Sequence, residues 1–337
     1  MRKVLLGVAV LLAAVLAPQA TAAKPSCSMG ARLIDAGGRL SCVHADRYDA
    51  YAQQPWLRST PAVATPYCYG DGQSGARVQM IYGYAAGKPN RAATMVPFIR
   101  NKIAPRMSAV VKASSAGQDL GIRFAYDNHC ASLSVPVVRF PASVIASHDA
   151  NAQLTAMITY LRSLGYTQTD RKFQVIWDWW NSEAICGLGE LVTDDTPGPL
   201  SPHDGQGSAM LVSDPQYSAV WRTAFSPKGP DCFELDQSKA GGEIHELFHT
   251  LGAVQQSAPH SDGGGHCTDT PSVMCPTRGT STVPVCARQR VQVLDCGNDD
   301  YWNPNPTLGS YLSTHRNIAA SDFFGPQPQD SLPLATP

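Results

Sequence analysis

The stretch EIHELFHTLG, residues 243–252, carries the strongest structural signal in the chain. Its apolar residues recur at helical spacing and would turn one apolar face toward a protein core. Gly252 is a typical residue just beyond a helix end. We therefore expect a helix from about residue 242 to residue 251. On such a helix His245 and His249 lie four residues apart and project from the same side.

This helix carries the pattern His-x-x-x-His with a glutamate after the first histidine, formed by His245, Glu246 and His249. Two imidazoles on one helix face can each offer a nitrogen to one Zn²⁺. Glu246 points to a neighbouring side, so it can act as general base on a zinc-bound water without binding the metal itself. The competing interpretation is a surface helix that carries two histidines by chance. The secretory context and the downstream sequence favour the metal site.

Together with Gly252 the pattern reads HExxHxxG, and Val273-Met274-Cys275 looks like a Met-turn downstream. These motifs resemble the metzincin branch of the zincin metallopeptidases. Residues of about 240–320 are also similar to a group of secreted bacterial zincin-like proteins, whereas the likeness of the N-terminal half rests on the order of its elements. The resemblance implies a secreted zinc-dependent metalloendopeptidase, with polypeptide substrates and Glu246 as its catalytic residue.

The third zinc ligand is where the chain departs from this family. The resemblance places that ligand three residues after Gly252, where this chain has Gln255. A neutral amide is a poor zinc ligand, so either the ligand lies elsewhere or the site is weak. The downstream candidates with a nitrogen or carboxylate donor are His260, Asp262, His266 and Asp269.

Among these candidates we favour His266, with His260 second and with Gln255 and the aspartates as the remaining alternatives. The run of three glycines that precedes His266 gives the backbone freedom to fold back over a cleft. Cys267 follows directly and can pair with Cys275, the neighbour of Met274, and this bridge would hold His266 beside the Met-turn. The ligand set predicted for zinc is therefore His245, His249 and His266.

The N-terminus predicts export. Arg2 and Lys3 precede an unbroken apolar run, and small residues at positions 20–22 suit a signal peptidase. The run is short for a transmembrane helix, so a membrane anchor is the weaker alternative. We expect residues 1–22 to be a signal peptide and the mature protein to be secreted, with no membrane segment.

The cysteine content and the net charge of the chain fit a secreted protein. All ten cysteines follow the expected cleavage site, and none forms a CxxC pair, which favours disulfides over metal thiolates. The nearest pairs are Cys267 with Cys275 and Cys286 with Cys296. The formal net charge of −1 gives no reason to expect a nucleic acid or an anionic membrane as partner. We expect a monomer.

Alternating strands and helices precede the key helix, which predicts an α+β fold with a mixed twisted sheet packed on helices and a loop-rich, disulfide-stapled C-terminal part. This is the zincin-like arrangement that the resemblance implies. We expect an irregular, cysteine-bearing extension over residues 24–75, one metallopeptidase domain over residues 76–324 and a disordered tail over residues 325–337. A helix over residues 95–112 should be kinked at Pro105.

Two weaker patterns stand outside the zinc motif. Residues 186–191 precede the key helix where zincins have an edge strand that binds extended peptide, and an ordinary disulfide-anchored strand is the alternative. A polar group is a candidate for Ca²⁺, although turn formation explains it better because the spacing is not that of an EF-hand. Its members are Asp295, Asn298, Asp299 and Asp300.

Three functions remain open at this stage. The first is the metalloendopeptidase. The second is a non-catalytic secreted binding protein on a degenerate zincin scaffold, which the missing third histidine supports and Glu246 opposes, because a structural zinc site has no use for that carboxylate. The third is a zinc amidase that acts on cell-wall amides with the same chemistry in a differently shaped cleft.

Overall fold

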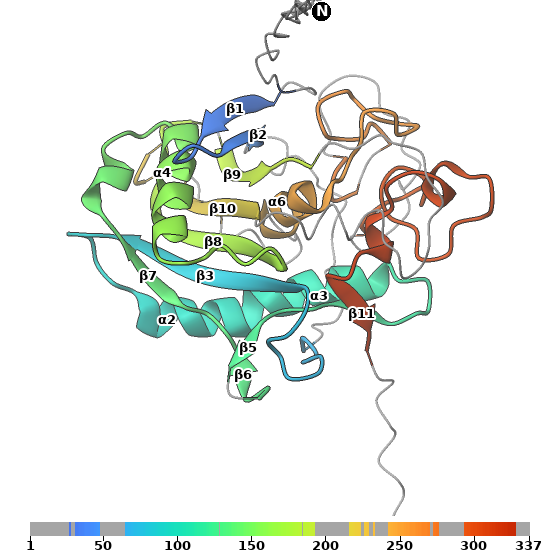
Figure 1. Ribbon diagram of the computed structural model, residues 1–337, viewed down its shortest axis with the longest axis horizontal. Helices are drawn as coiled ribbons and strands as arrows, with labels where there is room; N and C mark the ends of the chain where they lie inside the picture. Colours follow the sequence, from blue (N-terminus) through green and yellow to red (C-terminus); the bar gives the residue numbers. More distant parts are fainter. Residues whose placement is uncertain are drawn as a thin grey trace, which may run out of the picture.

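A seven-stranded sheet organises the chain (Figure 1), in the order β1-β2-β9-β10-β8-β3-β7. In that order the strands span Arg32–Asp35, Leu40–Arg47, Ile185–Glu190, Gln216–Thr223, Arg171–Trp180, Arg77–Ala85 and Val137–Phe140. Two small sheets pair β11 (Phe324–Pro326) with β4 (Leu120–Ile122) and β5 (Tyr126–Asp127) with β6 (Ser132–Leu133). The computed structural model describes residues 27, 31–47, 65–127, 129–183, 185–192, 216–223, 226–228, 232, 242–269, 272–275 and 293–327.

The sheet is mixed. Strands β10, β8, β3 and β7 run parallel, whereas β9 is antiparallel to β10, β2 to β9 and β1 to β2. The inner parallel strands are buried on both faces, which explains why β8 reads as a nearly continuous apolar and aromatic run. The predicted α+β class with a mixed sheet is confirmed at this level.

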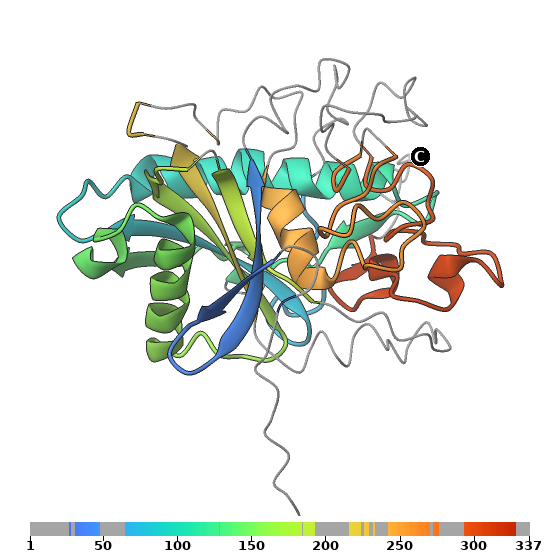
Figure 2. The ribbon, with the colours of Figure 1, turned by 90° about the horizontal axis from the view of Figure 1, so that it is seen from above.

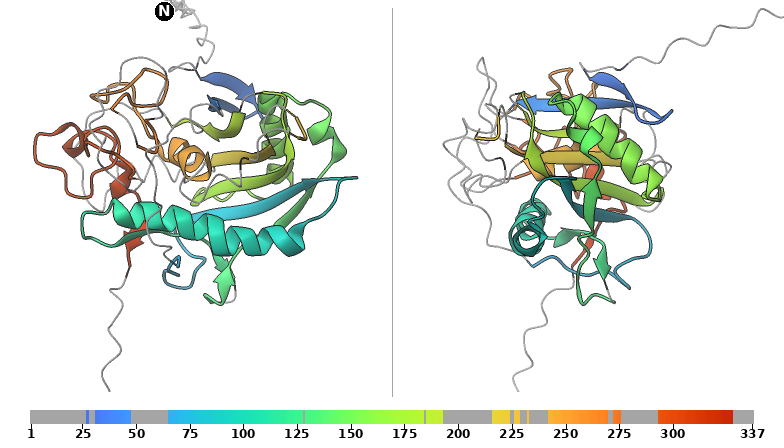
Figure 3. Two further views of the ribbon diagram at one scale, coloured as in Figure 1. Left: turned by 180° about the vertical axis from the view of Figure 1, so that it is seen from behind. Right: turned by 90° about the vertical axis from the view of Figure 1, so that its left-hand side faces the viewer.

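Helices cover both faces of the sheet (Figures 2 and 3). Helix α4 (Ala150–Ser163) lies on one face, and the side chain of Asp149 caps its first turn by accepting a hydrogen bond from the Ala152 backbone N–H. Helices α2 (Ala92–Phe98), α3 (Ala104–Ala113) and α6 (Gly242–Leu251) lie on the other face.

The helical stretch that runs from α2 to α3 is irregular just before Pro105. Helices α2 and α3 are joined by a π-helical segment over Ile99–Ile103, and Pro105 follows in the first turn of α3. Proline has no N–H group to donate to the carbonyl oxygen four residues earlier, so the regular α-helical hydrogen bond is missing there. The interruption predicted at Pro105 takes the form of a π-helical segment on its N-terminal side.

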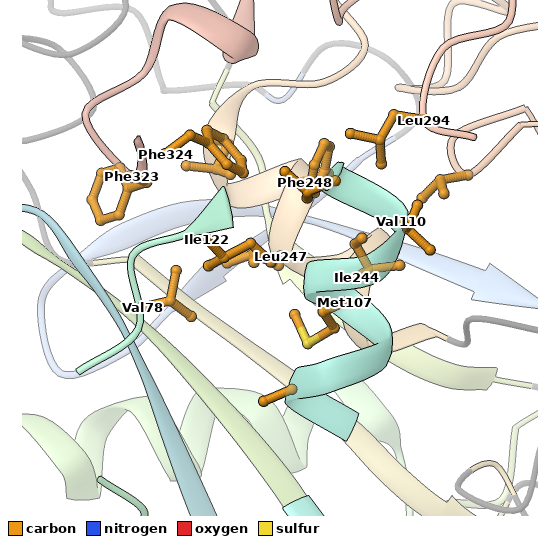
Figure 4. Close-up of a cluster of buried hydrophobic side chains, with 14 of the residues drawn as sticks. Val78, Met107, Val110, Ile122, Ile244, Leu247, Phe248, Leu294, Phe323 and Phe324 are labelled. Atoms are coloured by element: carbon orange, nitrogen blue, oxygen red, sulfur yellow. The ribbon is translucent and has the colours of Figure 1, made fainter. Parts of the chain in front are cut away.

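Two apolar clusters, one on each face of the sheet, form the core. The cluster on the α4 side joins that helix to β3, β8 and β10. The other joins α3 to α6 and the C-terminal loops (Figure 4), where Ile244, Leu247 and Phe248 lie among Met107 and Val110. The apolar face of α6 is therefore buried against α3 and the C-terminal loops. The polar residues His245, Glu246 and His249 belong to the same helix.

The prediction that residues 24–75 form an irregular extension is wrong in part, because two strands lie within this range. Strands β1 and β2 form a hairpin that joins the main sheet through antiparallel pairing of β2 with β9. Alternation of polar and apolar residues is weak here, so the pairing follows from the partner strand and not from the local pattern. At the other end, Phe324–Pro326 forms β11, so the tail predicted from residue 325 begins in a strand.

Four disulfides connect described residues: Cys27–Cys42, Cys68–Cys130, Cys186–Cys232 and Cys267–Cys275. The pairing predicted for Cys267 and Cys275 is confirmed, whereas Cys286 and the predicted signal peptide lie outside the described residues. These bridges fit an oxidising environment. Within the described ranges no helix is long and apolar enough to cross a membrane.

Candidate metal centre

Helix α6 is anchored at both ends. Glu243 in its first turn is buried and forms an ion pair with Arg106 of α3, with Oε1 at 2.7 Å from Nη2. Gly252 follows the helix with φ of +97°, a conformation that suits glycine at a helix C-terminus. The helix is thus fixed in position and length, which fixes the direction of every side chain it carries.

Three imidazoles meet at one point beside α6. The Nε2 atoms of His245 and His249 are 2.9 Å apart, and Nε2 of His266 is 3.2 Å from Nε2 of His245. All three side chains are buried. Donors on a tetrahedral zinc ion at about 2.0–2.1 Å are separated by about 3.3 Å, so these nitrogens are spaced as the edges of such a site.

The other ring nitrogen of each histidine faces an acceptor. Nδ1 of His245 lies 2.8 Å from the Val273 carbonyl oxygen, and Nδ1 of His249 lies 3.1 Å from the Ala253 carbonyl oxygen. Nδ1 of His266 is 3.7 Å from a carboxylate oxygen of Asp262. A proton on each Nδ1 leaves the Nε2 lone pairs directed at one another, and such outer partners are typical of metal-bound histidine. The donor set therefore fits a zinc ion.

The side chain of Glu246 lies between its own helix, α6, and strand β9. A Cβ atom built on Gly187 would lie 2.4 Å from Cγ of Glu246, and one built on Gly189 would lie 2.6 Å from its backbone oxygen. Only glycine at these two positions of β9 lets the helix approach so closely, and the Glu246 side chain uses that space. The Glu246 side chain is fully buried, one residue after His245 on the same helix.

A fourth histidine was missed by the sequence reasoning. His44 of β2 has its ring centroid 4.5 Å from that of His266 and 5.2 Å from that of His249. Its ligand nitrogen lies within 4.8 Å of those of both residues. No local motif surrounds His44, so only knowledge of the strand pairing could have found it.

The other candidates for third ligand lie elsewhere. Gln255 donates through Nε2 to the carbonyl oxygens of Val192 and Gly252, at 2.8 and 2.6 Å. His260 lies among carboxylates, with Nδ1 3.2 Å from Oδ2 of Asp300. Asp262, a candidate weighed from the sequence, stands behind His266 rather than beside the other two imidazoles.

The segment predicted as a Met-turn braces the cluster. Met274 is buried, its carbonyl oxygen accepts from the Cys267 N–H at 3.1 Å, and the Cys267–Cys275 bridge closes the same loop. The hydroxyl of Tyr301 accepts from the Met274 N–H and donates to the Leu294 carbonyl oxygen. Burial raises the pKa of Tyr301 well above its usual value. Tyr301 is therefore a buried support of this turn.

A second group of possible metal donors lies behind the loop of His266. Ligand atoms of His260, Asp269, Asp299 and Asp300 lie within 4.8 Å of one another. Burial, together with Asp300 and Asp295, raises the pKa of Asp269 to about 8. Its Oδ2 atom is buried and has no hydrogen-bond partner among the described residues.

Two of the four residues predicted for Ca²⁺ belong to this group, and two do not. Asp295 instead accepts backbone N–H groups of Asp300, Tyr301 and Trp302 through Oδ2. This is turn formation by a buried carboxylate. Asn298 has φ of +54° and offers its carbonyl oxygen to the Asn303 side chain. Asp269 and His260, first considered for zinc, take their places in the group.

No family model, curated protein or solved structure matches this chain significantly. The donor geometry of the histidine cluster therefore carries the functional conclusion.

Proposed function

We propose that this chain is a secreted zinc-dependent metalloendopeptidase of the metzincin type. The observation that supports it best is the convergence of the Nε2 atoms of His245, His249 and His266, with each Nδ1 atom facing an acceptor. The same arrangement includes a buried glutamate, Glu246, next to the first ligand on the same helix. Three protein ligands and a nearby carboxylate are the parts of a catalytic rather than a structural zinc site.

The chain's own residues divide the chemistry among them. His245, His249 and His266 would hold the metal, which when bound supplies Lewis-acid polarisation and lowers the pKa of a water molecule. Glu246 accepts a proton from the attacking water as its oxygen adds to the scissile carbonyl carbon. Glu246 then delivers that proton to the amide nitrogen as the C–N bond breaks, so that a carboxylic acid and an amine result.

The metzincin proposal has partial support from the order of the elements. Strand β9 is antiparallel to the parallel strands of the sheet and packs directly on α6. The prediction that residues 186–191 form an edge strand is wrong, because β9 pairs with both β2 and β10. An extended peptide could pair with β9 beside Glu246 only in a form of the protein in which β2 has left it.

The two rival functions differ in what they require of Glu246. A non-catalytic binding protein needs no carboxylate beside the metal, whereas here β9 carries glycine at the two positions that face Glu246. A cell-wall amidase would share the metal and the base but would not need a strand partner. Incubation of the zinc-loaded protein with a peptide library and with cell-wall fragments, analysed by mass spectrometry, tests all three. Cleavage of neither substrate, by the wild type or by a His44→Ala variant that lacks the fourth histidine beside the centre, would favour the binding protein.

Secretion belongs to the same proposal. The four described disulfides and the predicted signal peptide over residues 1–22 support it. We further propose that Asp269, Asp299 and Asp300 take a hard divalent cation such as Ca²⁺, because carboxylate oxygens are its preferred ligands. The buried Oδ2 atom of Asp269 supports this second, structural site, because it lies 4.0 Å from Nδ1 of His260 and has no hydrogen bond to a described residue.

A further inference from the structure

Strand β2 covers the strand of the sheet that borders the metal centre. It pairs antiparallel with β9 along Val43 to Arg47, so His44 stands opposite Gly189 and Asp46 opposite Gly187. The backbone groups of β9 on this side are thereby used by the chain itself. An extended substrate would need the same groups, because strand addition works through main-chain hydrogen bonds.

The register directs His44 toward the metal centre. Directly opposite residues of an antiparallel pair project from the same face of a sheet. Gly189 faces α6, since a Cβ atom built on it would lie 3.1 Å from Cβ of His249. His44 therefore faces α6 as well. This accounts for the position of its ligand nitrogen within 4.8 Å of those of His249 and His266.

The hairpin that carries His44 is firmly attached. The Cys27–Cys42 disulfide lies two residues before His44, and the Cys42 carbonyl oxygen accepts from the Leu191 N–H at 2.8 Å. Arg39 in the hairpin turn forms an ion pair with Glu190, whose carboxylate is buried. The last two contacts join the hairpin to the end of β9, and the disulfide ties β2 to the segment before the hairpin, so the strand that carries His44 is held in place.

We propose that His44 is a fourth ligand of the same metal ion and that the β1–β2 hairpin thereby holds the protein in a latent form. This inference rests on the proposed function, because latency presupposes the hydrolysis that the open site would perform. Four imidazoles complete a tetrahedral zinc site, whereas a catalytic site keeps one position for water. The hairpin thus has two effects. His44 occupies the ligand position that a catalytic water would need, and β2 occupies the edge of β9 that an extended substrate would need.

The ligand assignment is tested on the full mature chain loaded with Co²⁺ in place of zinc. His44→Ala should change the visible d–d absorption of the bound Co²⁺, because an imidazole nitrogen leaves the ion. Leu40→Ala is the matched control, since Leu40 begins the same strand and is 49% exposed. It should leave the spectrum as in the wild type. The wild-type spectrum in both variants would overturn the assignment of His44.

Latency is tested with His44→Ala and with His44→Gln, which keeps a bulky side chain if alanine proves unstable. Chelator competition should give at least a tenfold loss of zinc affinity, and peptide hydrolysis should rise at least tenfold over the wild type. Unchanged zinc affinity and unchanged hydrolysis in an active wild type would sink the inference and leave the proposed function standing. A changed Co²⁺ spectrum in His44→Ala with no hydrolysis by any variant would instead support the ligand and contradict the proposed function.

Discussion

Gly187 of β9 faces Glu246 of α6 so closely that a single methyl group between them would collide with the glutamate, at 2.4 Å from its Cγ atom. The side chain that performs the proposed proton transfer is therefore positioned by the absence of a side chain on the neighbouring strand. Gly187 has an extended backbone, so space rather than an unusual backbone angle requires glycine there.

We expect Gly187→Ala to reduce peptide hydrolysis by about 100-fold while the zinc content stays near one equivalent, because a displacement of about 1 Å at a reacting group costs that much. Gly242→Ala is the matched control: a Cβ atom there meets only ordinary contacts, at 3.9 and 4.0 Å. Activity and metal analysis are measured in parallel. Equal turnover of the two variants would show that Glu246 does not depend on this space.

We expect Glu246→Gln to abolish hydrolysis and to keep the metal. Glutamine has nearly the same shape but cannot accept the proton from water, and general-base assistance is worth about 10²–10⁴ in rate. Turnover of a casein or peptide-library substrate and zinc content measure the two effects. Because hydrolysis by the wild type is expected to be weak while His44 is in place, the substitution is best made in both the wild type and the His44→Ala variant. Wild-type turnover in the glutamine variant would exclude Glu246 as the base.

The sequence predicted helix α6, because its apolar spacing and its terminal glycine are local signals that the structure bears out. The cap at Asp149 likewise depends on local chemistry, a side-chain acceptor one residue before the helix. The β1–β2 hairpin could not be predicted in the same way, since the partner of β2 is β9, far along the chain. Strand pairing over such a distance leaves little trace in the short strand itself.

The metal donors likewise divide into those that local sequence signals predict and those that depend on the folded chain. His245 and His249 are related by helix geometry, so their spacing alone predicts that they meet. His266 and His260 belong to one loop, and nothing in their spacing says which of them folds back. In the structure the Asp262 side chain accepts the His266 backbone N–H, at 3.2 Å, and the Asp300 side chain accepts that of His260, at 2.8 Å. These two carboxylates separate the histidines into two different groups.

We expect His266→Ala to weaken zinc binding by more than about 100-fold, the upper end of what the loss of an outer-shell partner costs. His260→Ala and Gln255→Ala should change the affinity much less, because neither residue lies at the imidazole cluster. Chelator competition on the three variants makes the comparison. A large loss for His260→Ala with no loss for His266→Ala would move the third ligand to His260.

The carboxylates behind the His266 loop predict a dependence of stability on pH. Burial raises the pKa of Asp269 to about 8 and that of Asp295 to about 6, whereas in an unfolded chain both are near 4. The folded protein therefore holds these protons more tightly than the unfolded chain does. The resulting stabilisation is complete below about pH 4 and is lost as the pH rises toward 8.

We therefore expect the melting temperature of the zinc-loaded, calcium-free protein to fall between about pH 5 and pH 8, and the fall to be smaller in Asp269→Asn. Added Ca²⁺ should raise the melting temperature at pH 8 more than at pH 5, because it binds the ionised carboxylates and competes with their protons. Asp322→Asn, which changes a carboxylate in an exposed turn, should respond to Ca²⁺ like the wild type. An equal response of wild type and Asp269→Asn to Ca²⁺ at pH 8 would show that the buried carboxylate group does not bind the ion.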